Sequence, residues 1–546
     1  MEEFGSNSVR DIRPPMNKYA PSMWGDIFST FSFDDQMQET YEKSIEAGKK
    51  EIRSMLRDAS SGNLIILLDT IERLGLSYHF ETEMKLKLDQ IYNFHQDFDL
   101  FTTAHRFRLL RQNQYQVSCD VFAKFIGKDN KFEDIHSSDV DGLLSLYEAS
   151  HVRVDGESVL EEAVAFTTDH LTRLAQVLPE ASLSKDKVKQ ALQHPLHKGV
   201  PICNIRRYIS IYERDESRIQ LLLEIAKINF NFLQNIYKDE LCQLSRWWKK
   251  FDLKSKLVYA RDRIVECYLW GVAANFEPQY SYVRIAYAKS MKLCSVLDDT
   301  YDNYATLAEA ELFTQHIERW NMDNIDQLPD YMQIVYRFAM SIYEDYQRDA
   351  TTQDKAFAAP YFQETVKQLC RAYNTEQKWI MERQMPPFEV YINNSVFTSC
   401  IYFIFTALIP GIESATKEDI DWLLSEPKIV ISIAKMARHL QDLASHEREN
   451  RKGELLTVVD CYMQDRNVSK QEALAEFAEF VEVEWMNTNT EWAMHESSSA
   501  PKEIVKLLLN YARVADVTYK KSMDYYTSPE NSLAPQIVAL FVDPIP

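Results

Sequence analysis

The stretch Asp298-Asp299-Thr300-Tyr301-Asp302 sets two carboxylates four residues apart, the spacing of neighbours on one face of a helix. Asp298 and Asp302 therefore share a face, while Asp299 points roughly 100° away from it. The preceding residues carry an apolar stripe typical of a packed helix: Val283, Ala286, Leu293, Cys294 and Leu297. Two carboxylates on one face repel unless a cation lies between them, so the stretch predicts a metal-binding helix. An ordinary solvated acidic face would carry the same residues, so the stretch needs partners elsewhere in the chain.

A second group of oxygen ligands lies near residue 441. Gln441, Ser445 and Glu449 occupy positions i, i+4 and i+8 and line one helical face, and Arg438 lies close to that face. Magnesium keeps several waters and usually takes one or two carboxylates plus phosphate oxygens from a substrate. Two such groups across one cavity would hold a diphosphate between several metal ions. Taken alone, a solvated surface is the better explanation of this polar stripe.

An arginine pair supplies the basic partner. Arg261 and Arg263 are two residues apart and cannot share a helical face, so a loop or the start of a helix is their expected setting. There both guanidinium groups could close over one phosphate. As an isolated tripeptide, Arg-Asp-Arg is more often surface charge. The three signals gain weight together because they describe one chemistry.

Composition favours long helices. Only 12 of the 546 residues are glycine, against a usual ~7%, and 45% are hydrophobic. A chain poor in the residue of tight turns and phosphate-cradling loops does not suit sandwiches, barrels or nucleotide-binding α/β folds. We therefore predict an all-α protein of two helical domains. The stretch from His194 to Asn204 suggests a junction, with a structural domain at 1–215 and a metal-binding domain at 216–546.

Charge and cysteine content limit the partners and the compartment. The chain has 61 basic and 82 acidic side chains, a formal net charge of −21, which disfavours nucleic acid and anionic membranes as partners. Its eight cysteines include no CxxC pair and indicate reduced thiols of an intracellular protein. Glu2, Glu3 and Asp11 count against an organellar transit peptide. We expect a soluble, cytoplasmic protein, with the apolar stretch from Val396 to Ile412 as a buried helix rather than a membrane span.

Several longer motifs, in order along the whole chain, resemble those of plant sesquiterpene synthases, which are class I terpene cyclases of the terpene synthase family. They are Arg13-Pro14 with Pro21–Asp26, Gly142–His151, Arg261–Trp270, Asp298–Asp302, and Asp524–Thr527. The resemblance implies an N-terminal α-barrel-like domain and a C-terminal class I terpenoid synthase bundle. The N-terminal 215 residues contain no DxDD motif, so proton-initiated cyclisation is not expected.

The resemblance also implies roles for the candidate residues. Asp298 and Asp302 would bind magnesium, three ions in all, with manganese as a possible substitute. The diphosphate would be bound by Arg261, Arg263 and Arg438, and the second metal motif would be formed by Gln441, Ser445 and Glu449. The hydrocarbon pocket would be lined by Trp270 and Tyr526, with Tyr519 and Asp524 near its mouth. A broken helix that faces the developing positive charge is implied at Thr398, Ser399 and Cys400.

One position departs from the family pattern. The family has Asn or Asp where this chain has Gln441, whose carbonyl oxygen is one methylene farther out than that of Asn and lacks the charge of Asp. Asp442 cannot simply replace it, because one residue along a helix turns a side chain by about 100°. We therefore expect the metal ion at this site to bind more weakly, with Ser445, Glu449 and substrate oxygens as its main ligands.

The implied activity is magnesium-dependent ionisation of (2E,6E)-farnesyl diphosphate and cyclisation of the cation by a monomeric enzyme, to a sesquiterpene hydrocarbon or alcohol. One alternative is a monoterpene synthase acting on geranyl diphosphate. The lack of a plastid-type leader, and Arg13-Pro14 in place of a tandem arginine pair, favour the fifteen-carbon substrate. A second alternative is a homologue impaired by Gln441. A chain-elongating prenyl synthase would need a second aspartate-rich motif of the first type, which residues 438–449 do not supply.

Overall fold

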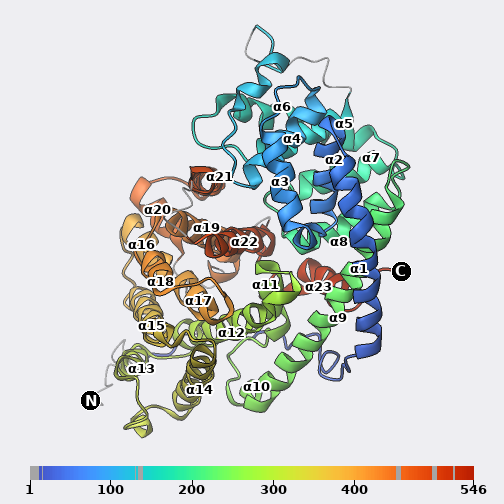
Figure 1. The fold of residues 1–546 in the computed structure, drawn as a ribbon. Coiled ribbons are helices and arrows are strands. Elements are labelled where there is room, and N and C mark those ends of the chain that lie inside the picture. Colours follow the sequence, from blue (N-terminus) through green and yellow to red (C-terminus); the bar gives the residue numbers. More distant parts are fainter. Residues whose placement is uncertain are drawn as a thin grey trace, which may run out of the picture.

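The protein is described by a computed structural model that covers residues 12–14, 16–128, 131–132, 139–450, 457–494, 501–520 and 523–546, without the side chains at 61, 447–450, 494 and 531. Helices make up nearly all of its regular structure (Figure 1). Within the described residues the β pairing is one isolated bridge between Ile126 and Phe132. The predicted all-α fold is therefore confirmed.

Within the described residues, eight α-helices form the N-terminal half of the molecule. They are α1 (Asp35–Asp58), α2 (Ser61–Arg73), α3 (Glu81–Tyr92), α4 (Leu100–Gln112), α5 (Val140–Ser150), α6 (Ser158–Val177), α7 (Leu183–Gln193) and α8 (Pro201–Tyr212). Helix α8 begins with proline at its first position, where a missing N–H leaves no intrahelical bond unmade. The boundary predicted near residue 215 falls between α8 and α9, and it stays a prediction.

The C-terminal half is the larger one. Its helices are α9 (Gln220–Phe251), α10 (Leu253–Lys256), α11 (Ile264–Ala274), α12 (Ser281–Asn303), α13 (Leu307–Arg319), α14 (Asp330–Thr352), α15 (Ala359–Met381), α16 (Phe388–Thr398), α17 (Ile401–Leu408), α18 (Lys417–Leu424), α19 (Lys428–Asn450), α20 (Val458–Arg466), α21 (Lys470–Met494), α22 (Lys502–Thr518) and α23 (Leu533–Phe541). Helices α11 and α12 pack closely together at its centre. Gly271 makes this approach possible, since a Cβ there would lie 2.5 Å from the carbonyl oxygen of Arg284.

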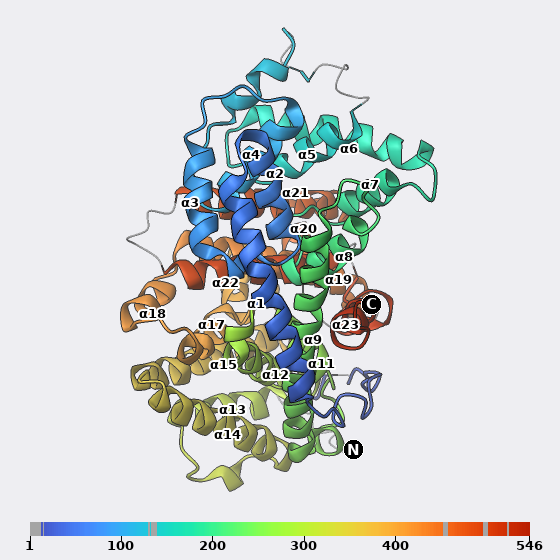
Figure 2. The same ribbon diagram turned by 45° about the vertical axis from the view of Figure 1, so that its right-hand side comes forward.

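The two halves share their main apolar core, and among the described residues three smaller clusters of buried side chains lie apart from it. A single cluster of buried side chains runs from Trp24 in the N-terminal segment to Ile545 near the end of the chain. Helices α21 and α22 lie between the two groups of helices (Figures 1 and 2). Polar contacts reinforce this position, because Arg153 of the N-terminal half pairs with Glu482 of α21 at 3.0 Å, and His197 bonds Asn489 at 2.7 Å. Since α21 and α22 also pack on α19, the N-terminal half supports that helix indirectly.

The most apolar segment of the chain is buried. Among the described residues, Phe388–Gly411 alone is long and apolar enough to pass as a membrane span, and 83% of its most apolar window is buried in the protein. Cys400 breaks this segment between α16 and α17 with a left-handed backbone, φ 64°. The prediction of a buried helix is confirmed, and the break lies at Cys400, in the stretch 398–400 where the family resemblance implies a broken helix.

A buried ion pair fixes α12 against α9. Arg284 is fully buried and donates to Glu240 through Nε at 2.8 Å and Nη2 at 2.6 Å. Its Nη1 also donates to the carbonyls of Asn275 and Glu277, at 3.1 and 2.6 Å. Such a pair is stable only while each charge keeps its partners.

We predict that Arg284→Met lowers the free energy of unfolding by about 3–5 kcal/mol, because it leaves the Glu240 carboxylate buried without its cation. Chemical denaturation measures the difference. Arg348→Met is the matched control, since Arg348 is 65% exposed and its pair with Asp345 should contribute less than about 1 kcal/mol. Equal stability of Arg284→Met and the wild type would contradict this role of the pair.

Candidate active site

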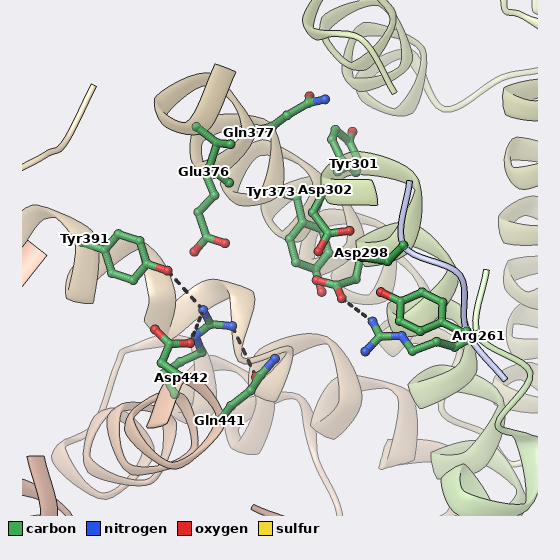
Figure 3. Close-up of a pocket in the computed structure, with 14 residues that line it drawn as sticks. Arg261, Asp298, Tyr301, Asp302, Tyr373, Glu376, Gln377, Tyr391, Gln441 and Asp442 are labelled. Carbon is green, nitrogen blue, oxygen red and sulfur yellow. Dashed lines mark hydrogen bonds and ion pairs between the residues drawn. The ribbon is translucent and has the colours of Figure 1, made fainter. Parts of the chain in front are cut away.

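A pocket opens between α12, α15 and α19 in the C-terminal half (Figure 3). It encloses about 690 Å³ of atom-free space, its open mouth included. Its lining residues are Asn17, Tyr19, Arg261, Asp298, Tyr301, Asp302, Tyr373, Glu376, Gln377, Ile380, Tyr391, Arg438, Gln441 and Asp442. The structure thus brings the aspartate motif, one arginine of the pair and the start of the second polar stripe to one cavity.

The aspartates form one wall of the pocket at the end of α12. Asp298, Asp299 and Asp302 each place a carboxylate oxygen within 4.8 Å of the others. Converging carboxylate oxygens are the donor set of a hard divalent cation, so these residues fit the predicted magnesium. As predicted, Asp298 and Asp302 share the face that lines the pocket.

Arg261 compensates the charge of this wall. It lies in the irregular segment before α11, as predicted, and its Nη2 pairs with Asp298 at 2.6 Å. Asp299 accepts the Arg261 backbone N–H through one carboxylate oxygen at 2.8 Å. Its other carboxylate oxygen forms an ion pair with Arg261 Nε, also at 2.8 Å. Burial raises the pKa of Asp299 to about 6, against the opposing charge of Arg261.

Arg263 has a different environment. It is buried, and it donates to the backbone carbonyls of Tyr526 at 3.2 Å and Thr527 at 2.9 Å. It is not among the residues that line the pocket. In this structure Arg263 ties the start of α11 to the segment after α22, and its predicted contact with diphosphate stays a prediction.

Helix α19 forms the opposite wall. Arg438 donates to Gln441 Oε1 and Tyr391 Oη, both at 3.3 Å, and pairs with Asp442 at 2.9 Å (Figure 3). The other oxygen of Asp442 accepts the N–H of Val458 at 2.8 Å, at the start of α20. Burial raises the pKa of Asp442 to about 6, against the charge of Arg438. Asp442 therefore orients Arg438 and anchors α20.

The rest of the second metal motif is only partly described. Ser445 lies one turn beyond Gln441 and is buried. The backbone of Glu449 belongs to α19, but its side chain lies outside the described residues. The metal roles of Gln441, Ser445 and Glu449 stay predictions.

Some pocket residues were not anticipated. Glu376 of α15 lines the pocket and accepts from Thr398 Oγ1 at 2.8 Å, and burial raises its pKa. Asn17 and Tyr19 reach the pocket from the N-terminal segment, where Tyr19 lies 5.3 Å from the Arg261 guanidinium. No sequence motif marks Glu376, Asn17 or Tyr19, and the motifs of the N-terminal segment are Arg13-Pro14 and Pro21–Asp26.

The predicted aromatic residues cluster between α11 and α22. Trp270 is buried and meets Tyr511 and Tyr519 edge to face, with ring centroids 5.5 and 6.4 Å apart. Tyr526 is buried too, and the Arg261 guanidinium lies 5.4 Å from its ring. Asp524 accepts the N–H of Thr527 at 3.0 Å and so shapes the turn that carries Tyr526.

The helix break faces this aromatic cluster. Thr398 ends α16, and the carbonyl of Ser399 accepts the Tyr511 hydroxyl at 2.7 Å. Cys400 contacts the Tyr373 hydroxyl through its sulfur at 3.1 Å. Thr398, Ser399 and Cys400 are thus tied to α15 and α22, while their predicted contact with substrate stays a prediction.

Comparisons with known proteins agree with this arrangement. Residues 23–192 match the family model "Terpene synthase, N-terminal domain", and residues 249–487 match "Terpene synthase family, metal binding domain". The chain is 53% identical to gamma-cadinene synthase of Ocimum basilicum, over 98% of this chain and 99% of that protein. It is 51% identical to gamma-curcumene synthase of Pogostemon cablin, over 100% of both.

A solved relative gives the same fold. The crystal structure of isoprene synthase from grey poplar leaves (Populus x canescens), in complex with three Mg²⁺ ions and dimethylallyl-S-thiolodiphosphate, superposes with a TM-score of 0.85. Its identity to this chain is 30%, with 93% of this chain and 98% of that one covered.

The chain therefore belongs to the plant terpene synthase family. The predicted enzyme class, a carbon–oxygen lyase acting on phosphates, is confirmed, as is the prediction of a sesquiterpene synthase. The predicted magnesium cofactor is likewise confirmed by the metal-binding domain, the aspartate cluster and the magnesium-bound relative.

The raised pKa values predict a pH-dependent stability of the metal-free protein. Asp299 and Asp442 hold their protons up to about pH 6 in the folded state, against about 3.9 unfolded. Their stabilising contribution is therefore complete below about pH 4 and is lost as the pH rises through about 6. Unfolding free energies in EDTA between pH 4 and 7.5 should show this decline, and Asp299→Asn should make it shallower because only Asp442 of the two would still contribute. An unchanged slope in that variant would exclude Asp299 as its source.

Proposed function

We propose that this terpene synthase ionises (2E,6E)-farnesyl diphosphate with magnesium and cyclises the resulting cation to a sesquiterpene, releasing diphosphate. One observation carries the proposal: Asp298 and Asp302 on α12 face Arg438 and Gln441 on α19 across one pocket, with Arg261 at its edge. A diphosphate between these walls would meet cations from both sides.

The protein's own residues prepare the site for a leaving group. Bound magnesium would act as a Lewis acid that stabilises charge on the departing diphosphate. Asp298 and Asp302 offer oxygen ligands, while Arg261 and Arg438 present N–H donors that are already oriented by Asp299 and Asp442. Preoriented donors need little reorganisation when charge develops.

The apolar part of the site protects the cation. Trp270, Tyr511, Tyr519 and Tyr526 are all buried, so a hydrocarbon chain among them would be shielded from water. Each aromatic face near the cation would contribute about 0.5–2 kcal/mol. The carbonyl of Ser399 is fixed by Tyr511 and adds a dipole at the helix break.

The setting of the reaction follows from simpler observations. All eight cysteines are free, in keeping with a reducing compartment, and we propose that the enzyme acts in the cytoplasm. One chain supplies both walls of the pocket, so the site needs no residue from a partner subunit, and we propose that the enzyme acts as a monomer. Manganese as a substitute for magnesium, and a ten-carbon substrate in place of farnesyl diphosphate, remain alternatives.

We predict that the purified protein converts farnesyl diphosphate to a sesquiterpene in the presence of magnesium and not in EDTA, as read by mass spectrometry of extracted products. Asp298→Asn should lower kcat/KM at least about 100-fold, because a metal ligand loses its charge. Asp421→Asn is the control, since this half-exposed aspartate of α18 pairs with Lys417 and accepts the Tyr361 hydroxyl at the surface, and it does not line the pocket. Higher turnover of geranyl diphosphate than of farnesyl diphosphate would favour the monoterpene alternative.

Gln441 allows a separate test of the second metal motif. We predict that Gln441→Asp lowers the magnesium concentration needed to bind inorganic diphosphate several-fold, because a carboxylate replaces a neutral amide oxygen. Gln441→Leu should raise it. Calorimetric titration of magnesium into protein with diphosphate measures both. No difference among the three proteins would remove Gln441 from the metal site, and product formed only by Gln441→Asp would identify the wild type as an impaired homologue.

A further inference from the structure

Helix α12 carries a buried lysine, Lys292, that has no part in the metal site or in the proposed mechanism. Lys292 has a relative exposure of 0%. Its Nζ donates to the backbone carbonyl of Arg261 and lies 4.5 Å from the centre of the Trp248 ring. Burying an ammonium group is unfavourable unless it is well partnered, so its position calls for a reason.

Lys292 belongs to a stripe of α12 whose side chains form hydrogen bonds with the backbone of the segment before α11. Lys292, Asp299 and Asn303 lie at i, i+7 and i+11, and therefore on one face of the helix. Asp299 accepts the N–H of Arg261 at 2.8 Å, and Asn303 donates to the carbonyl of Tyr259 at 3.0 Å. Asp298 and Asp302 lie on the adjacent, pocket-facing stripe. One stripe of α12 thus faces the pocket, and the adjacent stripe holds the irregular segment before α11 that contains Arg261.

The segment is also held from its other side. Trp248 of α9 covers the Lys292 ammonium and donates its indole N–H to Asp262 at 2.8 Å. Burial lowers the pKa of Lys292, an effect opposed by Cys267, Asp299 and Asp262. The ammonium therefore lies between the Trp248 ring and the Arg261 carbonyl. The carboxylates of Asp299 on α12 and Asp262 before α11 favour its charged form.

We propose that Lys292 is a positioning residue for the diphosphate site, an inference that rests on the proposed function. Arg261 lies in irregular backbone, where no helical hydrogen bond fixes its peptide planes. Asp299 holds its N–H and Lys292 holds its carbonyl, so the residue is fixed on both sides of its Cα. This restraint aims the guanidinium at the pocket before the substrate arrives.

The test compares Lys292→Met, which keeps the volume but removes the donor, with Lys292→Gln, which keeps a shorter N–H donor. Affinity for inorganic diphosphate in saturating magnesium is measured by calorimetry. We expect it to fall about 10-fold in the Met variant and about 3-fold in the Gln variant, since a hydrogen bond from a charged donor is lost or weakened. In the metal-free protein, tryptic cleavage at the exposed Lys254 and Lys256 should become faster in the same order.

Lys289→Met is the matched control. Lys289 lies one turn earlier on α12, 5.3 Å from the Trp247 ring and 3.7 Å from Asp345, so this variant should keep the wild-type affinity and cleavage rate. Wild-type affinity in a folded Lys292→Met protein would overturn the inference. Should that variant not fold, unchanged affinity and cleavage in Lys292→Gln would do so instead. A wild-type protein that binds no diphosphate would overturn the proposed function itself.

Discussion

The contact between Arg261 and the aspartates of α12 is the interaction on which the site depends. Asp298, Asp299 and Asp302 crowd their carboxylates within 4.8 Å, an arrangement that repels itself in a partly buried wall. Arg261 offsets that repulsion through Asp298 and Asp299 at once. A protein with a net charge of −21 can present this acidic wall to an anionic substrate only because cations are concentrated beside it.

The opposite wall follows the same rule with different parts. Arg438 pairs with Asp442, which also accepts the first N–H of α20 and so links the site to the next helix. Each wall thus joins an arginine, an acid that orients it and a structural anchor. The acids that orient the arginines, Asp299 and Asp442, are buried, whereas Asp298 and Gln441 are partly exposed at the pocket. Charge orientation and substrate contact are divided between adjacent residues.

Helical spacing predicted those features of the site that lie along one helix. The shared face of Asp298 and Asp302, the irregular setting of Arg261 and the proximity of Arg438 to Gln441 all follow from it. Low glycine content predicted the all-α fold, and the break at Cys400 came from family resemblance rather than composition. Contacts between distant segments could not be read in this way. Glu376 and Lys292 carry no local pattern, because their surroundings exist only after α12 has packed against its neighbours.

The pairing of Arg153 and Lys198 with Glu482 gives the N-terminal half an influence on chemistry that it does not perform. These contacts fix α21, which packs on α19. Helix α22 also packs on α19, and it carries an aromatic side chain, Tyr511, that contacts Trp270. A ring-closing cation distinguishes wall positions that differ by a methyl group. A substitution at these contacts of Glu482 would therefore change the carbon skeleton of the product, although every metal ligand and arginine of the site stayed the same.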